Sequence, residues 1–390
     1  MPSRRRFLAA LGASGTLASA GCSALPTGAN GSDCVPARDP DWQIRGEFWS
    51  PPVRGGQTTY VAEGYTVTGD GTRYRIAAVE DYEGQERWVY NVVDGGTGVP
   101  LLDGDRLYVG TGTDHVLSFG AETGHLQWRY EAGGRETYGG GAWGQPATAD
   151  DLVLVGVSHS DRPDPDPTNH EAYVHRIVAL DREDGGERWS YRADRQFFAG
   201  PVVAGDVAVA ISRGGRVVAA SLADGTERWT DDLGGEATHP PIRTDEYVVV
   251  AAGRTVVGLD PVSGERAWEA TTSGVVTAFE AGDAALLVGG DDGRLVALDP
   301  DDGREQWRHG VGVPPVDVAS DGARTWVLDR TGVVHRLDAA SGERRDRFRV
   351  GASPDPDSCG WTHREGQGIA VDGDWVYVTG PWVARFPAAG

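Results

Sequence analysis

The stretch that decides the fold is IVALDREDGGERW at residues 177–189, which recurs as VVGLDPVSGERAW at 256–268 and LVALDPDDGREQW at 295–307. Each copy has an apolar run, a turn containing glycine, and a tryptophan four residues after that glycine. Six tryptophans recur in this way, 40, 61, 40, 39 and 39 residues apart. A period near 40 residues indicates a supersecondary unit that must stack on its neighbours. The pairs are Gly84 and Trp88, Gly124 and Trp128, Gly185 and Trp189, Gly225 and Trp229, Gly264 and Trp268, and Gly303 and Trp307.

Residues 241–270 show how one unit is built. Short β-rich segments at 241–243, 247–251, 255–259 and 265–270 are separated by turns rich in Asp, Gly and Pro. Apolar, β-branched runs bounded by such turns are typical of strands. Four short antiparallel strands at this period predict one blade of a β-propeller. We expect the glycine to adopt a positive φ and the tryptophan to pack between neighbouring blades.

The end of the chain predicts how the ring closes. A seventh unit has Asp346 where the tryptophan would be, and three further strands between residues 368 and 386 lack an outer partner. An N-terminal strand can complete that blade and hide its edge. Trp49 lies 39 residues before the first repeat tryptophan, and Trp42 has a similar context. We therefore predict an all-β, eight-bladed propeller of four-stranded antiparallel blades, closed by an N-terminal strand; seven blades is the alternative.

The three quoted strings resemble the repeat of the quinoprotein-like (PQQ-like) propellers, A-x-D-x-x-T-G-x-x-x-W. Six units match over about residues 74–310, and no Trp-Asp dipeptide of the other common 40-residue propeller family occurs. The chain is most similar to the stand-alone, BamB-like lipoprotein members. That resemblance implies a non-catalytic propeller that presents one face to partner proteins.

Charge and composition restrict the partners. The formal charge is −22, and all 36 basic residues are arginine. Such an acidic chain argues against nonspecific binding to nucleic-acid phosphates, so we predict no nucleic-acid partner. A carboxylate-rich surface without lysine is typical of proteins kept soluble in concentrated salt, which favours a haloarchaeal source. An acidic protein from a high-GC genome is the alternative.

The N-terminus predicts export. Ser3–Leu8 has the twin-arginine pattern, and the apolar stretch at 7–20 is too short for a convincing membrane span. Cys22 stands where a lipoprotein signal ends, although Ser19 replaces the large aliphatic residue of that pattern. Cleavage after Ala20, which would release a soluble protein, is the alternative. The expected parts are a signal peptide at 1–21, a tether lipidated at Cys22 over 22–40, and the propeller at 41–390. We expect a monomer anchored to the outer side of the cell membrane.

Strand alternation predicts that the insertions share one face. In a four-stranded meander, turns between the second and third strands emerge beside the links between blades. The insertions at 131–144, 158–172 and 351–367 occur at such positions. We call this the insertion face and predict that it binds a protein or glycan partner, since long loops on rigid scaffolds commonly carry function. Solvated loops without a ligand are the alternative. The candidates are Arg135, Tyr138, Trp143, His159, Asp161, Arg162, His170, Phe197, Phe198, Trp361, His363 and Arg364.

Two cysteines remain if Cys22 carries lipid. An even number of cysteines in an oxidising compartment is compatible with a disulfide between Cys34 and Cys359, and two unpaired thiols are the alternative. Cys359 lies in an insertion, whereas Cys34 precedes a strand that should start at the opposite face. Pairing therefore requires residues 35–41 to run back across the blade.

Motifs for chemistry are few. Asp161, Asp164 and Asp166 supply the oxygen ligands that calcium prefers, but the stretch lacks the glycine and glutamate of an EF-hand and favours a proline-stiffened loop. No hydrolase, zinc or phosphate-loop motif occurs. We expect no metal, no cofactor and no catalytic residue.

Three functions are compatible with this sequence. The predicted one is a non-catalytic scaffold that binds a partner on the insertion face. A PQQ-dependent dehydrogenase is one alternative, since those enzymes share the repeat. The resemblance then implies a longer chain, often with adjacent cysteines and acidic calcium ligands, and this chain has no adjacent cysteines. A carbohydrate- or peptide-binding sensor is the other alternative.

Overall fold

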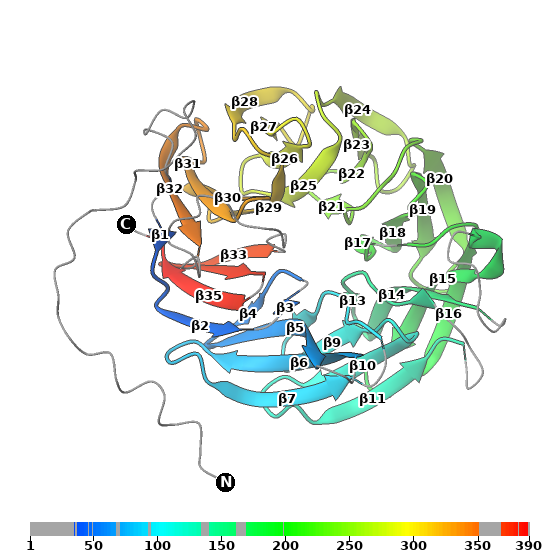
Figure 1. The fold of residues 1–390 in the computed structure, drawn as a ribbon. Coiled ribbons are helices and arrows are strands. Elements are labelled where there is room, and N and C mark those ends of the chain that lie inside the picture. The colour runs from blue at the N-terminus through cyan, green and yellow to red at the C-terminus, as the bar shows by residue number, and fades with distance from the viewer. Residues whose placement is uncertain are drawn as a thin grey trace, which may run out of the picture.

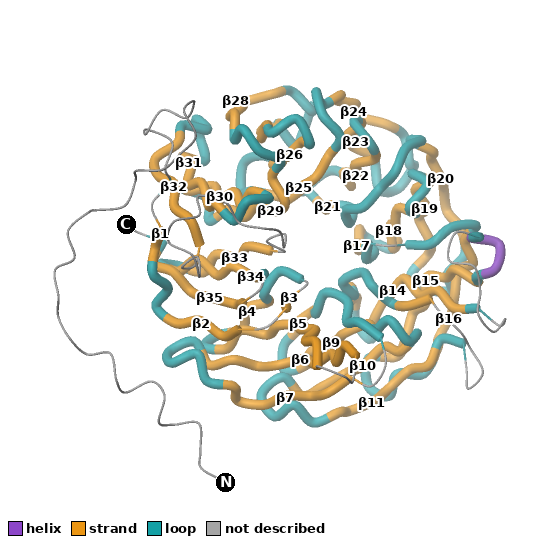
Figure 2. Tube along the Cα trace, in the orientation of Figure 1, coloured by secondary structure: helices purple, strands orange, loops and turns teal. Residues whose placement is uncertain are grey.

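The computed structural model describes residues 35, 37–45, 47–48, 50–67, 71–92, 95–133, 140–160, 169–197, 199–350, 368–380 and 382–388. They form eight β-sheets arranged in a ring around one axis, with all strand pairs antiparallel except that of one two-residue strand in blade 7 (Figures 1 and 2). The eight-bladed propeller is therefore confirmed, and the seven-bladed alternative is wrong. No helix in this part of the chain is long and apolar enough to cross a membrane.

Blades 1 to 4 follow one another along the chain. Blade 1 has β3 (Glu47–Phe48), β4 (Val53–Gly55), β5 (Thr58–Val67), β6 (Gly71–Glu80) and β7 (Glu86–Val92). Blade 2 has β8 (Leu101–Asp103), β9 (Arg106–Gly110), β10 (His115–Gly120) and β11 (Leu126–Glu131). Blade 3 has β12 (Gly140–Gly141), β13 (Ala147–Ala149), β14 (Leu152–His159), the 3-10 helix η2 (His170–Ala172), β15 (Val174–Asp181) and β16 (Glu187–Ala193). Blade 4 has β17 (Val202–Ala204), β18 (Val207–Ile211), β19 (Arg216–Ser221) and β20 (Glu227–Asp232).

Blades 5 to 8 complete the ring. Blade 5 has β21 (Ile242–Arg243), β22 (Val248–Ala252), β23 (Thr255–Leu259) and β24 (Arg266–Thr271). Blade 6 has β25 (Val276–Ala281), β26 (Leu286–Gly290), β27 (Arg294–Leu298) and β28 (Glu305–Gly310). Blade 7 has β29 (Pro315–Ser320), β30 (Arg324–Asp329), β31 (Val333–Asp338) and β32 (Arg344–Val350). Blade 8 has β33 (Gly368–Asp372), β34 (Trp375–Thr379), β35 (Trp382–Pro387) and the N-terminal β2 (Trp42–Arg45).

The core lies between blades rather than within them. Every side chain of β18 is buried, whereas the outer strand β20 exposes most of its side chains. One typical cluster joins Val209 and Val217 of blade 4 to Val250 and Leu259 of blade 5. Each blade thus buries its apolar faces against its neighbours, as the 40-residue period requires.

The repeated tryptophan and glycine form a lock between consecutive blades, as expected. Each indole packs on the positive-φ glycine of the next blade's turn, where an added Cβ would meet the ring. Each Nε1–H also donates to a backbone carbonyl in that turn, over 2.6 to 3.1 Å. The seven locks are Trp42 on Gly84, Trp88 on Gly124, Trp128 on Gly185, Trp189 on Gly225, Trp229 on Gly264, Trp268 on Gly303, and Trp307 on Gly342.

Blade 8 is closed by the N-terminal strand, as predicted. β2 pairs antiparallel with β35, and Trp42 faces Arg385. Trp42 lies 46 residues before Trp88, more than one repeat, because β3 adds a strand to blade 1. Trp49, at the repeat distance, lies outside the described residues.

The junction between blades 7 and 8 explains why Asp346 replaces tryptophan. The turn that would receive an indole is absent from blade 8, because both ends of the described chain meet there. A short strand, β1 (Ala37–Arg38), pairs parallel with β32 instead. The Arg38 guanidinium pairs with Asp346 at 2.7 Å, stacks on Phe348 at 4.0 Å and donates to the Pro387 carbonyl. Arginine therefore replaces the indole at this junction.

Candidate functional site

Strand register brings the second-to-third turns and the links between blades to the same face. In blade 4, Arg216 pairs with Asp232, and the amide of Leu233 donates to the Gly215 carbonyl across 3.0 Å. In blade 3, His159 pairs with Val174 at the equivalent end. The described residues that flank the three insertions therefore lie at one face, as the meander requires.

Blades 1 and 3 extend further on this face than their neighbours. Strands β5 and β6 have ten residues each, and β14 and β15 have eight, against five for β18. The far end of each long hairpin carries an additional inner strand. β3 pairs with β5 at Gly64 and Glu63, and β12 pairs with β14 at His159 and Ser158. Two five-stranded blades therefore flank blade 2 on the insertion face.

Most of the predicted site residues cannot be placed. Trp143, His159 and Phe197 are described, and His170 lies in η2. The remaining predicted residues lie outside the described ranges: Arg135, Tyr138, Asp161, Arg162, Asp164, Asp166, Phe198, Trp361, His363 and Arg364, together with Cys22, Cys34 and Cys359.

Trp143 anchors a link rather than standing free on the surface. Its half-buried indole packs on a glycine surface, where a Cβ at Gly96 or Gly112 would come within 2.8 or 2.5 Å of the ring. The carbonyl of Trp143 accepts the Val99 amide, and the Ala142 amide donates to Thr111. The segment after β12 is thereby fixed across blade 2.

His159 lies beside a buried Ser–His pair. Ser158 Oγ and His175 Nδ1 are 2.8 Å apart. That distance suits a nucleophile and its base. Ser158 and His175 are, however, only 2% and 3% exposed, and they face each other as paired residues of β14 and β15. The pair and the buried His159 therefore belong to the packing of the long hairpin.

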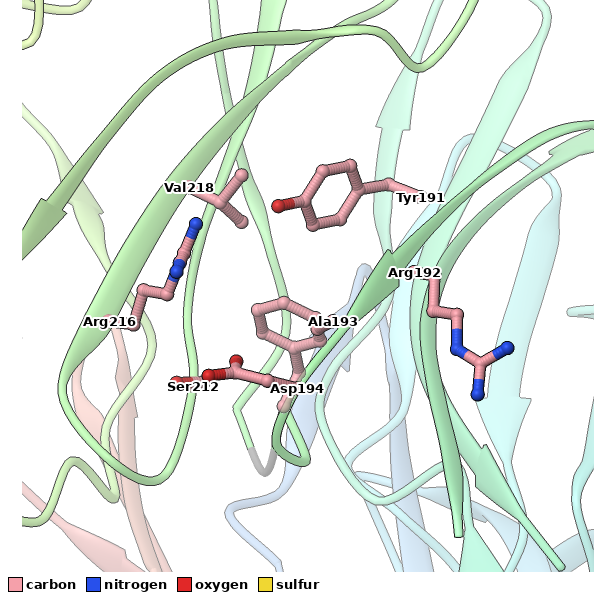
Figure 3. Close-up of a pocket in the computed structure, with 8 residues that line it drawn as sticks. Tyr191, Arg192, Ala193, Asp194, Ser212, Arg216 and Val218 are labelled. Atoms are coloured by element: carbon pink, nitrogen blue, oxygen red, sulfur yellow. The ribbon is translucent and has the colours of Figure 1, made fainter. Parts of the chain in front are cut away.

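A cavity of about 190 Å³ opens on the insertion face between blades 3 and 4. Figure 3 shows the ring of Tyr191, Val218, Ser212 and the Arg216 guanidinium converging on it, while Arg192 points away. Phe197 is buried against Gly156 of β14, and a Cβ added at Gly156 would lie only 2.8 Å from the Cβ of Phe197. The lining residues are Tyr191, Arg192, Ala193, Asp194, Phe197, Ser212, Arg216 and Val218.

The two hydroxyl groups of this cavity, on Tyr191 and Ser212, differ in their hydrogen bonding. The Tyr191 hydroxyl donates to Glu227 at 2.6 Å, and burial together with this carboxylate raises the pKa of Tyr191 to about 12. Tyr191 is therefore neutral at physiological pH. Ser212 is 2% exposed, and its hydroxyl has no hydrogen-bond partner among the described residues. The cavity thus offers aromatic walls and one unsatisfied hydroxyl.

Two carboxyl groups on innermost strands have strongly shifted titrations. Burial raises the pKa of Asp317 on β29 to about 7, and partial desolvation together with the nearby Asp317 raises the pKa of Glu280 on β25, whose side chain is still exposed to solvent. Asp317 accepts the amides of Val318 and of Ile369 in the next blade, at 2.9 and 2.8 Å. Asp317 therefore joins blades 7 and 8. Within the described ranges, no group of three His, Cys, Asp or Glu side chains is arranged to hold a metal.

Sequence reasoning missed these groups for different reasons. Asp317 had a visible signal, a charged residue between Val316 and Val318 in an apolar strand. Among the residues that line the cavity, the sequence analysis had singled out Phe197. Tyr191 gave no signal, because Tyr90 and Tyr130 occupy the same position in two other repeats.

Comparison with known proteins agrees with this architecture. A family model described as outer membrane protein assembly factor BamB matches residues 28–162 and 174–325. The chain belongs to this family. A search of curated proteins gave no significant match.

Solved structures with the same fold include a BamB family member and an enzyme. BamB from Moraxella catarrhalis is 18% identical with a TM-score of 0.63, over 90% of this chain and 99% of that one. Quinohemoprotein alcohol dehydrogenase from Comamonas testosteroni is 12% identical with a TM-score of 0.67, over 90% and 76%. The computationally designed Ika8 protein is 14% identical with a TM-score of 0.70, over 88% and 98%. At these identities the likeness establishes the propeller fold alone.

Proposed function

We propose that this BamB-family propeller is a non-catalytic scaffold that docks a protein partner on its insertion face. The observation that carries the proposal is the aromatic cavity of about 190 Å³ between blades 3 and 4, beside the long hairpin of blade 3. Binding energy in protein interfaces concentrates where one anchoring side chain fills such a pocket. Tyr191, Phe197 and Val218 suit an apolar anchor, and Ser212 suits a polar tip.

The charge around this cavity favours an acidic partner segment. Arg192 and Arg195 are exposed and make no ion pair among the described residues. Arg216 lies 3.8 Å from Glu227, and Arg213 pairs with Glu236. The charges beside the cavity without an ion pair among the described residues are Arg192, Arg195 and the lining Asp194, and this net positive charge in a chain of charge −22 favours acidic segments during encounter.

Charge reversal at the cavity tests the proposal. The variant Arg192→Asp/Arg195→Asp changes two exposed side chains without removing a described ion pair. Immobilised protein is incubated with membrane extract, and bound proteins are quantified by mass spectrometry. We expect enrichment of a defined partner to fall about tenfold, equivalent to about 1.4 kcal/mol. The matched control, Arg304→Asp, changes an arginine that is 81% exposed in a turn on the opposite face, and it should retain the partner. Equal loss in both variants would overturn the face assignment.

We also propose that the scaffold is exported by the twin-arginine route and held at the outer side of the membrane by lipid on Cys22. The Arg4–Arg6 run and the position of Cys22 after small residues support this. Stable anchoring requires more than one acyl chain. Mass spectrometry of the mature N-terminus should find a diacylglyceryl-modified Cys22. An unmodified terminus after Ala20 would refute the tether.

The absence of a cofactor is part of the proposal. The enzyme among the structural neighbours makes a quinone site the competing function. Purified protein is supplied with PQQ and calcium and assayed for dye-linked oxidation of alcohols and sugars. We expect no turnover above the protein-free control. Saturable, enzyme-dependent dye reduction would replace the scaffold with a dehydrogenase.

A further inference from the structure

A second cavity, of about 530 Å³, lies where the ring closes between blades 8 and 1. It opens on the face opposite the insertions, because the first-to-second turns of both blades and the third-to-fourth turn of blade 1 border it. Its lining residues are Arg54, Gly56, Gln57, Glu80, Asp81, Tyr82, Asp372, Gly373, Asp374, Trp375, Tyr377 and Arg385.

The repeat shows why this junction is open. The same DGD-x-x-Y motif occurs at 103–108 in blade 2 and at 372–377 in blade 8. At the junction of blades 2 and 3, Arg182 extends to Asp103, with Nη2 and Oδ2 2.9 Å apart. The turn position of Arg182 is occupied in blade 1 by Asp81, whose side chain is much shorter. Asp81 therefore leaves part of the corresponding space unfilled, and Arg54 reaches into it to pack on Tyr377.

Two buried guanidinium groups form the floor of this cavity. Arg54 pairs with Asp81 at 2.5 Å and Asp372 at 2.9 Å, and stacks on Tyr377 at 4.2 Å. Arg385 stacks on Trp375 at 3.9 Å and pairs with Asp41, outside the lining. Because both guanidinium groups are paired and packed, the floor is rigid.

Two donors in this floor lack acceptors. Tyr377 is fully buried, and its hydroxyl lies beside the Arg385 guanidinium, which cannot accept, and donates to no described residue. The Nε of Arg54 is likewise buried without a partner. A buried donor without a partner costs about 1–3 kcal/mol, so both groups favour a ligand oxygen that accepts.

The rim of the cavity carries acceptors, which require a ligand that donates hydrogen bonds. Glu80 and Asp374 present carboxylates that accept hydrogen bonds, and the lining carries four carboxylates against two guanidinium groups. This excess disfavours an anionic ligand. Tyr82 is 80% exposed at the edge and offers an apolar ring. The cavity therefore requires a neutral ligand whose groups both donate and accept.

We propose that this cavity binds a neutral oligosaccharide. The hydroxyl groups of a sugar accept from Tyr377 and Arg54 and donate to Glu80 and Asp374, which no purely cationic or anionic group does. The apolar face of a pyranose ring packs on the exposed ring of Tyr82. A volume of about 530 Å³ lies in the range of small-ligand pockets. The site is independent of the docking surface on the insertion face.

Titration calorimetry tests the proposal, with maltotriose and mannotriose as neutral probes and trilysine and sialyllactose as charged ones. We expect saturable binding of a neutral trisaccharide that exceeds both charged probes. Tyr377→Phe should weaken it at least fivefold, and Tyr82→Ala should weaken it similarly. Tyr108→Phe, which removes the matching hydroxyl in blade 2, should leave it unchanged.

Several outcomes would overturn the sugar site. They are no binding of either neutral trisaccharide, tighter binding of trilysine, or equal losses in Tyr377→Phe and Tyr108→Phe. Circular dichroism checks that each variant is folded, and Tyr82→Ala alters an exposed side chain and so keeps the test valid if Tyr377→Phe unfolds. Loss of sugar binding leaves partner capture by the insertion face unaffected, so the two proposals fail separately.

Discussion

The tryptophan–glycine lock predicts a strong coupling between two residues in different blades. Trp229 of blade 4 donates to the Pro261 carbonyl at 2.9 Å and covers Gly264 of blade 5. Gly264 has φ +75°, and a Cβ there would lie 2.5 Å from the indole Cδ2. Gly264→Ala therefore introduces both backbone strain and a clash with the ring. Gly205 has a similar φ of +63° with nothing within 4 Å, so Gly205→Ala introduces strain alone.

The expected magnitudes follow from these contacts. Gly205→Ala should cost about 1–2 kcal/mol for the left-handed conformation. Gly264→Ala adds overpacking of about 1–3 kcal/mol against the ring. Trp229→Ala should cost about 3–5 kcal/mol. In the double variant the ring is absent, so Gly264→Ala again costs only its strain, and the coupling energy is about 1–3 kcal/mol.

Guanidinium chloride unfolding, followed by tryptophan fluorescence in concentrated KCl, measures the four free energies of the cycle. A coupling of at least about 1 kcal/mol is expected, and contacting residues commonly show this much. Additive effects within about 0.5 kcal/mol would refute the lock. Equal costs for Gly264→Ala and Gly205→Ala would refute it as well.

Three further predictions concern the closure of the ring. Arg38→Ala should lower the free energy of unfolding by about 1–2 kcal/mol in chemical denaturation, since it removes the Asp346 pair and a cation–π contact; no change would refute the substitute lock. The raised pKa of Asp317 means that the folded protein keeps a proton that the unfolded chain releases, so the free energy of unfolding should fall as pH rises from about 4 to 7. Asp317→Asn should reduce this fall by about 1–3 kcal/mol in unfolding experiments at several pH values. The same pH profile in the variant and the parent protein would contradict this. Peptide mapping without reductant should find Cys34 joined to Cys359, and free thiols at both positions would exclude the bridge.

Much of the fold could be predicted because each repeat in the sequence corresponds to one blade. The glycine positions specify turns that need positive φ, and the tryptophan spacing counts blades. The role of Arg38 was not predictable, because an ion pair with Asp346 depends on a parallel strand from the far end of the chain. β1 also lies within the segment expected to be a tether, and it pairs with Arg349 and Val350 just before the insertion that contains Cys359. Cys34 and Cys359 lie outside the described residues, so their disulfide stays a prediction.

The proposed docking surface could be predicted from the sequence only at the level of the face. Alternation of strands indicates where turns emerge, and the register agrees. Cavities depend instead on which side chain is short or missing at one junction, such as Asp81 in the place of Arg182. The effect of such a difference on a cavity is visible only when equivalent positions of the blades are compared in the structure. Trp143, a binding candidate by its aromatic character, packs on glycines that lie far from it in the sequence.

The central claim is that the insertion face docks a protein. Site-specific photocrosslinking in living cells tests it most directly, with the photoreactive residue placed at Arg192 beside the cavity or at Arg304 on the opposite face. We expect one defined protein adduct from position 192 and none from position 304. An adduct from both positions, or from position 304 alone, would contradict it, and so would the absence of any adduct at 192.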